Sequence, residues 1–285
     1  MRVLYLLSDA AYLLLYYVIG YRKKIVMTNL AIAFPDRSLV ERQEIARKFY
    51  LSFTDNFIEA IKLVSASKSF LSGRFQLDNP ELLQQFFEQG RKCQLHLGHH
   101  FNWEIANIAM PSYTDYRFLV VYMPIENKVF DRIFLKIRSR TGVGLLSAMT
   151  LSRSILSYRK TQYLLTLVAD QAPAKLASSY WAYFFGRATP FMQTPEKGAR
   201  IGNIPVVFGK IYKIKRGYYR ATLSLGSDNP ADLPEGELTR RYIRFLEETI
   251  RENPDLWLWT HRRWKHSWIS TNRKNWIGES RPPAD

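Results

Sequence analysis

Short apolar segments alternate with helical ones along most of this chain, and this alternation constrains the fold more than any other feature. Strands are predicted at residues 93–97, 117–122, 144–146, 163–169 and 205–208. Helices are predicted at residues 80–89, 103–110, 128–140, 151–159 and 195–201. Such alternation predicts an α/β fold with a mostly parallel central sheet flanked by helices. Polar groups that follow the strands should meet at the carboxyl edge of the sheet.

Three further patterns complete this outline. Residues 39–64 have helical periodicity, and we expect their apolar stripe to pack into the core. The stripe consists of Ile45, Phe49, Phe53, Phe57, Ile61 and Val64. Residues 210–225 predict a hairpin, and residues 238–251 predict a final helix. Because the sequence shows no internal repeat or low-complexity linker, it predicts one domain at residues 22–285 after an N-terminal segment at residues 1–21.

The N-terminal segment is a nearly unbroken apolar run from Val3 to Tyr21. As a helix it would be about 28 Å long, close to the hydrocarbon thickness of a bilayer. Three basic residues follow at once, Arg22, Lys23 and Lys24, which favours a cytoplasmic location for the rest of the chain. The segment is predicted to be a membrane anchor or a half-buried interfacial helix. The alternative is a helix that packs on the domain.

Composition narrows the possible partners. The net charge is +16 and the pI is about 9.9, which suits an anionic lipid, an acidic protein or a nucleic acid. The sequence contains no glycine-rich phosphate loop, zinc-finger spacing or RNA-binding aromatic motif. The single cysteine, Cys93, excludes an internal disulfide and lies in an apolar strand pattern, so we expect a buried structural thiol.

A histidine and a carboxylate follow the first of the alternating strands. His99 comes directly after Gly98, and Glu104 lies five positions further on, at the start of the next helix. Asn102 is a favourable N-cap for that helix. A carboxylate that holds one ring nitrogen of a histidine leaves the other free to take a proton from a hydroxyl. The pattern predicts a base, His99, oriented by Glu104. A turn histidine beside a first-turn acid remains the alternative.

Two other groupings involve His99. His96, His99, His100 and Glu104 are all residue types that bind zinc. However, His99 and His100 are adjacent and should point apart, and no His-Glu-x-x-His pattern is present, so no metal site is predicted. Asp170 follows the strand expected at residues 163–169, and it should meet His99 at the carboxyl edge of the sheet.

The His99–Glu104 stretch belongs to a longer series of motifs. In chain order they are Tyr21-Arg22-Lys23-Lys24, Asn29-Leu30, Phe34-Pro35, His99-His100-Phe101-Asn102-Trp103-Glu104, Tyr122-Met123-Pro124, Asn127, Asp131, Arg138, Ala169-Asp170-Gln171, Phe184-Phe185-Gly186 and Trp257-Leu258-Trp259-Thr260-His261-Arg262-Arg263-Trp264. Together, and in register over almost the whole chain, they resemble the late acyltransferases of lipid A, the lauroyl and myristoyl transferases. Met123, Phe101 and Ala172 depart from the family pattern, so the resemblance implies the reaction more firmly than the acceptor.

The resemblance implies a glycerolipid-acyltransferase-like fold and an O-acyltransferase that needs no cofactor or metal. The donor would be an acyl-carrier-protein thioester, and the acceptor a hydroxyl of an anionic glycolipid, a lipid A precursor. His99 would be the general base, with its tautomer fixed by Glu104. Arg138 would stabilise the oxyanion, and Asp170 would support the site.

The same resemblance implies a location at the cytoplasmic face of the inner membrane, with no nucleic-acid partner. Four tryptophans near the C-terminus are expected at the level of the lipid headgroups, although a structural role for Trp257 and Trp259 stays open. They are Trp257, Trp259, Trp264 and Trp268. Two alternatives remain: transfer to a lysophospholipid or aminolipid, and a non-catalytic basic protein that binds membranes or nucleic acid.

Overall fold

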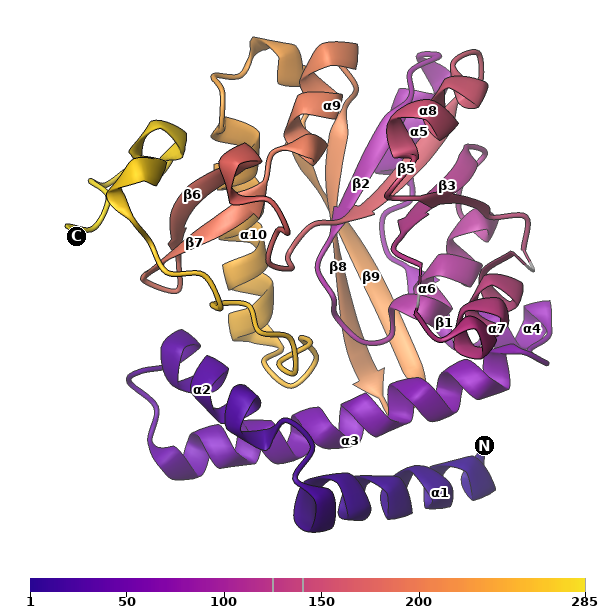
Figure 1. The fold of residues 1–285 in the computed structure, drawn as a ribbon. Coiled ribbons are helices and arrows are strands. Elements are labelled where there is room, and N and C mark those ends of the chain that lie inside the picture. The colour runs from indigo at the N-terminus through magenta and orange to yellow at the C-terminus, as the bar shows by residue number, and fades with distance from the viewer. Residues whose placement is uncertain (125, 140, 285) are drawn as a thin grey trace.

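A seven-stranded sheet with the order β1-β9-β8-β2-β5-β3-β4 forms the centre of the molecule (Figure 1). The computed structural model describes residues 1–124, 126–139 and 141–284. The strands are β1 (Phe75–Leu77), β2 (Cys93–Leu97), β3 (Arg117–Tyr122), β4 (Gly144–Ser147), β5 (Tyr163–Val168), β8 (Val206–Lys215) and β9 (Tyr218–Ser227). Every neighbouring pair is parallel except β8 and β9, which form the expected hairpin. The predicted α/β class with a mostly parallel sheet is confirmed.

Helices cover both faces of the sheet (Figure 1). The longer ones are α1 (Arg2–Leu13), α2 (Lys23–Ala33), α3 (Leu39–Leu63), α5 (Glu81–Glu88), α6 (Trp103–Ala109), α7 (Lys128–Ser139), α9 (Thr194–Gly202) and α10 (Glu237–Glu252). Two short helices are α4 (Lys68–Ser72) and α8 (Leu151–Ser154). Helix α8 continues as a 3-10 helix (Ile155–Tyr158), and together the two cover nearly all of the helix expected at residues 151–159. Residue 140, the expected end of the helix that forms α7, lies outside the described residues.

Strand β2 lies at the centre of the sheet, between β8 and β5. All five of its residues are buried, including Cys93, as expected for a strand that is covered on both faces. In β5, five of the six residues are buried as well. The carboxyl ends of these two strands therefore lie side by side, and the loops that follow them are held by a rigid part of the core.

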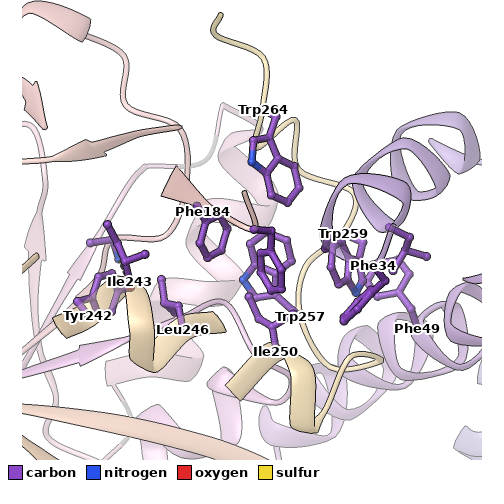
Figure 2. Packing of buried hydrophobic residues seen from close by; sticks show 14 of the residues in the cluster. Phe34, Phe49, Phe184, Tyr242, Ile243, Leu246, Ile250, Trp257, Trp259 and Trp264 are labelled. Atoms are coloured by element: carbon purple, nitrogen blue, oxygen red, sulfur yellow. Dashed lines mark hydrogen bonds between the residues drawn. The ribbon is translucent and has the colours of Figure 1, made fainter. Parts of the chain in front are cut away.

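The sequence analysis missed an antiparallel hairpin, β6 (Ser179–Phe184) and β7 (Arg187–Met192), which lies apart from the main sheet. The hairpin packs against the C-terminal aromatic residues. Phe184 stacks on Trp264 with ring centroids 5.6 Å apart, and Figure 2 shows Trp257 amid Phe184, Ile250 and Trp259.

Trp257, Trp259 and Trp264 are all buried, so their placement at the lipid headgroups is wrong. The structural role that the sequence left open for Trp257 and Trp259 is confirmed. Phe184 of β6 contacts Trp257 and Trp264, and Phe34, at the end of α2, contacts Trp259. These contacts help to remove the tryptophan rings from solvent. Trp268 is partly buried against Trp181, with ring centroids 5.4 Å apart. The tail is thus part of the folded core and not a separate surface element.

Helix α3 begins at a capping box, in which the Ser38 hydroxyl accepts from the Glu41 amide and the Glu41 carboxylate accepts from the Ser38 amide. The stripe predicted along this helix is correct only in its first half. Ile45, Phe49 and Phe53 are buried, but the second half of the stripe is exposed to solvent. The exposed members are Phe57, Ile61 and Val64, with exposed fractions of 47%, 61% and 43%.

The second half of α3 buries polar side chains instead, among them Asp55 and Glu59. Helix α1, which continues as a π-helical segment (Leu14–Ile19), lies along this face of α3 (Figure 1). The buried Ser8 donates to Asp55 at 2.7 Å, and Asp9 forms an ion pair with Arg216 at 2.6 Å. By length and composition, Arg2–Ile19 is a candidate membrane span, yet one side of it packs on the domain.

Candidate active site

The turn after β2 brings His99 to the carboxyl edge of the sheet. Gly98 leaves room for this turn, because a Cβ at this position would lie 2.7 Å from the Leu246 Cδ2 atom and 2.8 Å from the His100 ring. The expected N-cap is confirmed: Asn102 Oδ1 accepts from the amides of Glu104 and Ile105 at 3.1 and 3.2 Å. Helix α6 therefore begins directly after the turn.

His99 pairs with Asp170, which follows β5. His99 Nδ1 lies 2.5 Å from Asp170 Oδ1, and the His99 backbone amide donates to Asp170 Oδ2 at 2.8 Å. The register of the two strands explains the pairing. Leu97 lies opposite Val168, so the residues two positions further along each chain become neighbours. The sequence analysis expected these residues at one crevice, and the structure brings them into direct contact.

Glu104 is not the carboxylate at the His99 ring, contrary to the sequence-based expectation. The Arg138 guanidinium binds the Glu104 carboxylate through two N–H groups: Nε donates to Oε2 at 3.0 Å, and Nη2 donates to Oε1. Trp103 Nε1 donates to Oε1 as well, at 3.0 Å. The physical reason is the first turn of α6, whose orientation points Glu104 towards α7 instead of back towards the turn.

Trp103 connects the two pairs. Its ring lies edge-on to the His99 ring, with centroids 5.6 Å apart, while its N–H donates to Glu104. All four residues predicted for the site are thus brought together in the order Asp170, His99, Glu104 and Arg138. They form two pairs, instead of one pair with two auxiliary residues.

The charges of Asp170 and Arg138 are fixed by their surroundings. Burial opposes ionisation of Asp170, but the neighbouring ring and amide of His99 and a hydrogen bond from Trp257 outweigh it. The pKa of the Asp170 carboxyl therefore lies well below its usual range. Burial disfavours the charge of Arg138, yet Glu104 overcompensates and raises the pKa of the guanidinium above its ordinary value. Asp170 is an anion and Arg138 a cation at neutral pH.

His99 is the accessible member of its pair. Its side chain is 23% exposed, whereas that of Asp170 is 1% exposed. Because Asp170 accepts at Nδ1, the ring carries its proton there and leaves Nε2 as an acceptor. The Gln171 side-chain amide lies 3.3 Å from this nitrogen. The arrangement can remove a proton from a hydroxyl placed at Nε2. Gln171 was seen in the sequence only as the neighbour of Asp170.

Two distant segments hold the site in place, and the sequence analysis assigned neither of them a site role. Trp257 Nε1 donates to Asp170 Oδ2 at 2.7 Å. The backbone on each side of it pairs with the turn: the Leu258 amide donates to the His99 carbonyl at 3.1 Å, and the Phe101 amide donates to the Leu256 carbonyl at 2.9 Å. The only sequence signal was the resemblance of residues 257–264 to a family motif.

The second segment is α10. The buried Tyr242 hydroxyl donates to the Leu97 carbonyl at 2.6 Å and accepts from the Ala169 amide at 3.3 Å. One side chain therefore joins the ends of β2 and β5. Its two bonds lie two residues before His99 and one residue before Asp170. Because the strand ends cannot separate without breaking these bonds, the distance between His99 and Asp170 is set by the core.

The residues weighed as zinc ligands have separate environments. His96 is buried and lies 2.9 Å from the side-chain amide of Gln94. His100 is buried, His99 faces Asp170, and Glu104 is held by Arg138. Over the described ranges, no group of three or more His, Cys, Asp or Glu side chains is placed to bind a metal.

The fold and the site define an α/β protein with a histidine–aspartate pair at the carboxyl edge of its sheet and a glutamate–arginine pair beside it. The model of the bacterial lipid A biosynthesis acyltransferase family matches residues 2–266 of the 285-residue chain. The chain belongs to this family, and it is an acyltransferase of lipid A biosynthesis. No curated protein gives a significant match to the sequence. The alternative of a non-catalytic basic protein is thereby set aside.

The buried histidines predict an acid-sensitive fold. Burial lowers the pKa of His96 to about 3 and that of His100 to about 4. In the unfolded chain both rings take up protons below about pH 6.5, whereas in the folded chain they stay neutral until the pH approaches these lower values. Stability should therefore be retained above pH 6.5 and fall by about 1.4 kcal/mol per pH unit for each ring as the pH drops towards 4.5.

Urea unfolding at pH 7, 6, 5 and 4.5 measures this loss, and His96→Gln isolates one ring. The variant should show a shallower decline between pH 6 and 4.5 than the parent protein. Parallel curves for the two proteins would contradict the assignment of a neutral buried imidazole at this position.

Proposed function

We propose that this acyltransferase moves a fatty acyl chain from an acyl-carrier-protein thioester to a hydroxyl of a lipid A precursor at the cytoplasmic face of the inner membrane. The observation that carries the proposal is the His99–Asp170 pair: a buried anion holds Nδ1 and leaves Nε2 accessible. Family membership supports lipid A as the acceptor class. The acyl carrier protein as donor rests on the resemblance in sequence.

The proposed reaction has two steps. His99 Nε2 takes the proton of the acceptor hydroxyl. At the same time the hydroxyl oxygen attacks the thioester carbonyl carbon and forms a tetrahedral oxyanion. The oxyanion then collapses, the carbon–sulfur bond breaks, and the leaving thiolate takes the proton back from the His99 imidazolium. The products are an ester and a free thiol. Asp170 keeps its negative charge throughout and stabilises the imidazolium.

This scheme exchanges the roles that the sequence suggested for the two carboxylates. Asp170 fixes the tautomer of His99, because it is the group bonded to Nδ1. Glu104 instead orients Arg138 by accepting from Nε and Nη2, and it does not use Nη1. A guanidinium held in this fork is preorganised to stabilise a developing oxyanion.

The charge of the protein suits both proposed substrates. The net charge of +16 complements an acidic carrier protein and a phosphorylated glycolipid. Electrostatic attraction of this kind raises the rate of encounter and weakens as salt is added. A mass-spectrometric assay with purified protein, an acyl-carrier-protein thioester and a lipid A precursor tests the proposal directly. Transfer to a lysophospholipid in preference to the lipid A precursor would favour the alternative acceptor.

The membrane attachment that we propose is interfacial. One side of α1 and its continuation contacts α3, and the opposite side exposes apolar side chains. These include Val3, Leu6, Leu7, Leu13, Leu14, Val18 and Ile19. A helix whose polar side chains, Ser8 and Asp9, bind the domain suits the membrane surface better than a span. We name these seven residues the outer face of the N-terminal helix.

Two observations support the outer face as the membrane-facing surface. Phe57, Ile61 and Val64, at the end of α3, are exposed apolar side chains as well. The cations of residues 22–24 follow the helix, at the position where anionic headgroups attract Lys and Arg. The carboxyl ends of β2 and β5 point towards α3 (Figure 1), so the site lies on the side of the molecule nearest the proposed membrane.

The roles of the two carboxylates are separable by kinetics. His99→Ala and Asp170→Asn should each lower turnover by about 10²–10⁴-fold, because one removes the base and the other its orienting charge. The double variant should be little worse than either single variant, since the two residues act as one unit. Initial rates of acyl transfer measure this, with Asp228→Asn, an exposed acid paired with Arg91, as the control. Parent-like turnover of Asp170→Asn would reject its role at the base.

Arg138 is tested by comparing turnover with apparent acceptor affinity. Arg138→Ala should lower turnover by about 10²–10³-fold with little change in KM, because the guanidinium acts on the oxyanion. Arg138→Lys should restore little, since an ammonium cannot reproduce the fork that Glu104 holds. Arg132→Ala is the matched control on the exposed side of α7. It should weaken acceptor binding only slightly, and added salt should remove the difference. Arg140, the next basic residue along the chain, lies outside the described residues. Equal effects at Arg138 and Arg132 would remove Arg138 from the site.

Apolar side chains of the outer face can be replaced by polar ones without changing the residues of the helix that contact α3. Replacing Val3, Leu6 and Val18 by Ser should shift the protein from the membrane pellet to the soluble fraction in high salt, because each buried apolar side chain contributes roughly 1.5–3 kcal/mol. Ile201→Ser is the control, since Ile201 is 88% exposed and lies on α9. Unchanged sedimentation of the triple variant with membranes would contradict the interfacial attachment.

A further inference from the structure

A buried carboxylate outside the two catalytic pairs connects the N-terminal helix to the active site. Glu59 lies on α3 and is 5% exposed. Three side chains donate to it: Tyr5 at 2.9 Å, Asn102 at 2.9 Å and Tyr219 at 2.8 Å. Tyr5 comes from α1, Asn102 from the turn that carries His99, and Tyr219 from β9. The contacts therefore join three parts of the chain that are far apart in the sequence.

Asn102 uses both ends of its amide. Its Nδ2 group donates to Glu59, while its Oδ1 atom accepts from the amides of Glu104 and Ile105, the second and third residues of α6. The position of Glu59 therefore fixes the start of the helix that presents Glu104 to Arg138. A shift of the Asn102 side chain would move this helix start and the turn at His99 together.

The N-terminal helix places Tyr5 in this network through several contacts of its own. Arg216 bridges Asp9 and Asp55, each at 2.6 Å, and its guanidinium lies 4.4 Å from the centroid of the Tyr5 ring. Gly217, at the turn of the β8–β9 hairpin, has a φ of +77° and leaves room for the tyrosine. A Cβ at this glycine would lie 2.0 Å from the Tyr5 hydroxyl.

We propose that Glu59 is a positioning residue and that the N-terminal helix, through Tyr5 and Glu59, is part of the framework of the active site as well as a membrane attachment. The inference rests on the proposed function, because it assigns a task to the Asn102 cap in acyl transfer. Glu59 touches none of the reacting groups in the proposed mechanism, and it acts through Asn102.

The energetics of a buried carboxylate explain why each donor matters. Burial raises the pKa of the Glu59 carboxyl, and hydrogen bonds from Asn102, Tyr219 and Tyr5 counteract this rise. A charged acceptor that loses one donor in a buried site adjusts its remaining bonds or exchanges its charge for a proton. Either response reaches Asn102, which shares the Oε2 atom with Tyr219.

The test uses substitutions that remove one hydroxyl or one charge. Tyr5→Phe keeps the ring beside Arg216 and the outer face of the helix, so membrane sedimentation and KM should stay at parent values while kcat falls roughly 3- to 30-fold. Glu59→Gln should lower kcat at least as much. If Tyr5 acts through Glu59, the double variant should be no slower than Glu59→Gln alone. Tyr183→Phe is the matched control, because its hydroxyl donates at an exposed site to the Arg281 carbonyl.

A second readout does not depend on activity. Hydrogen exchange of the Glu104 and Ile105 amides reports the Asn102 cap, and it should be several-fold faster in Tyr5→Phe than in the parent or in Tyr183→Phe. Parent-like exchange at these amides, or parent-like kcat in an active Tyr5→Phe protein, overturns the proposal. If Glu59→Gln does not fold, Tyr5→Phe decides alone. A parent without acyl transfer contradicts the proposed function, whereas the exchange result still decides on the positioning role.

Discussion

The buried Asp170 carboxylate is the interaction on which both the fold and the site depend. It accepts from the His99 amide, from the His99 ring and from Trp257, and thereby joins the end of β5, the turn after β2 and the C-terminal segment. A buried charge that loses its partners costs about 3–5 kcal/mol of stability. The contacts that hold His99 for catalysis in the proposed mechanism therefore also satisfy a buried anion and stabilise the fold.

The sequence predicted those elements of the fold that leave a periodic pattern of apolar residues. Alternation of strands and helices specified the parallel sheet, and the interrupted segment at residues 210–225 specified the β8–β9 hairpin, because both leave a periodic signal. The β6–β7 hairpin was missed because its residues are largely buried, so its strands lack a polar alternation. The tryptophans beyond α10 were misplaced for a related reason. Aromatic and basic residues look alike in a sequence whether they face lipid or a core.

The sequence predicted which residues form the site, but it did not predict which of them pair with each other. Spacing singled out His99 and Glu104, the position after a strand indicated Asp170, and the resemblance added Arg138, yet the direct partner of His99 lies 71 residues away. Only the register of β2 against β5, with Leu97 opposite Val168, shows that Asp170 is opposite His99. A sequence gives no direct access to register, since it is set by the packing of both strands against neighbouring helices. Glu104 is close enough in sequence to be a plausible partner of His99, but the orientation of α6 directs its carboxylate towards Arg138.

The contact between α1 and the second half of α3 includes buried polar side chains, and this explains why hydropathy alone could not decide the fate of the N-terminal segment. The shared face of the two helices contains Ser8, Asp55 and Glu59, which hydrogen bonds and Arg216 satisfy, while apolar side chains lie outside. Polar contacts between the helices have a specific geometry, whereas apolar contacts with lipid do not. In the proposed attachment, the apolar outer face rests on a fluid membrane while the hydrogen bond from Asn102 to Glu59 holds the start of α6 in one position.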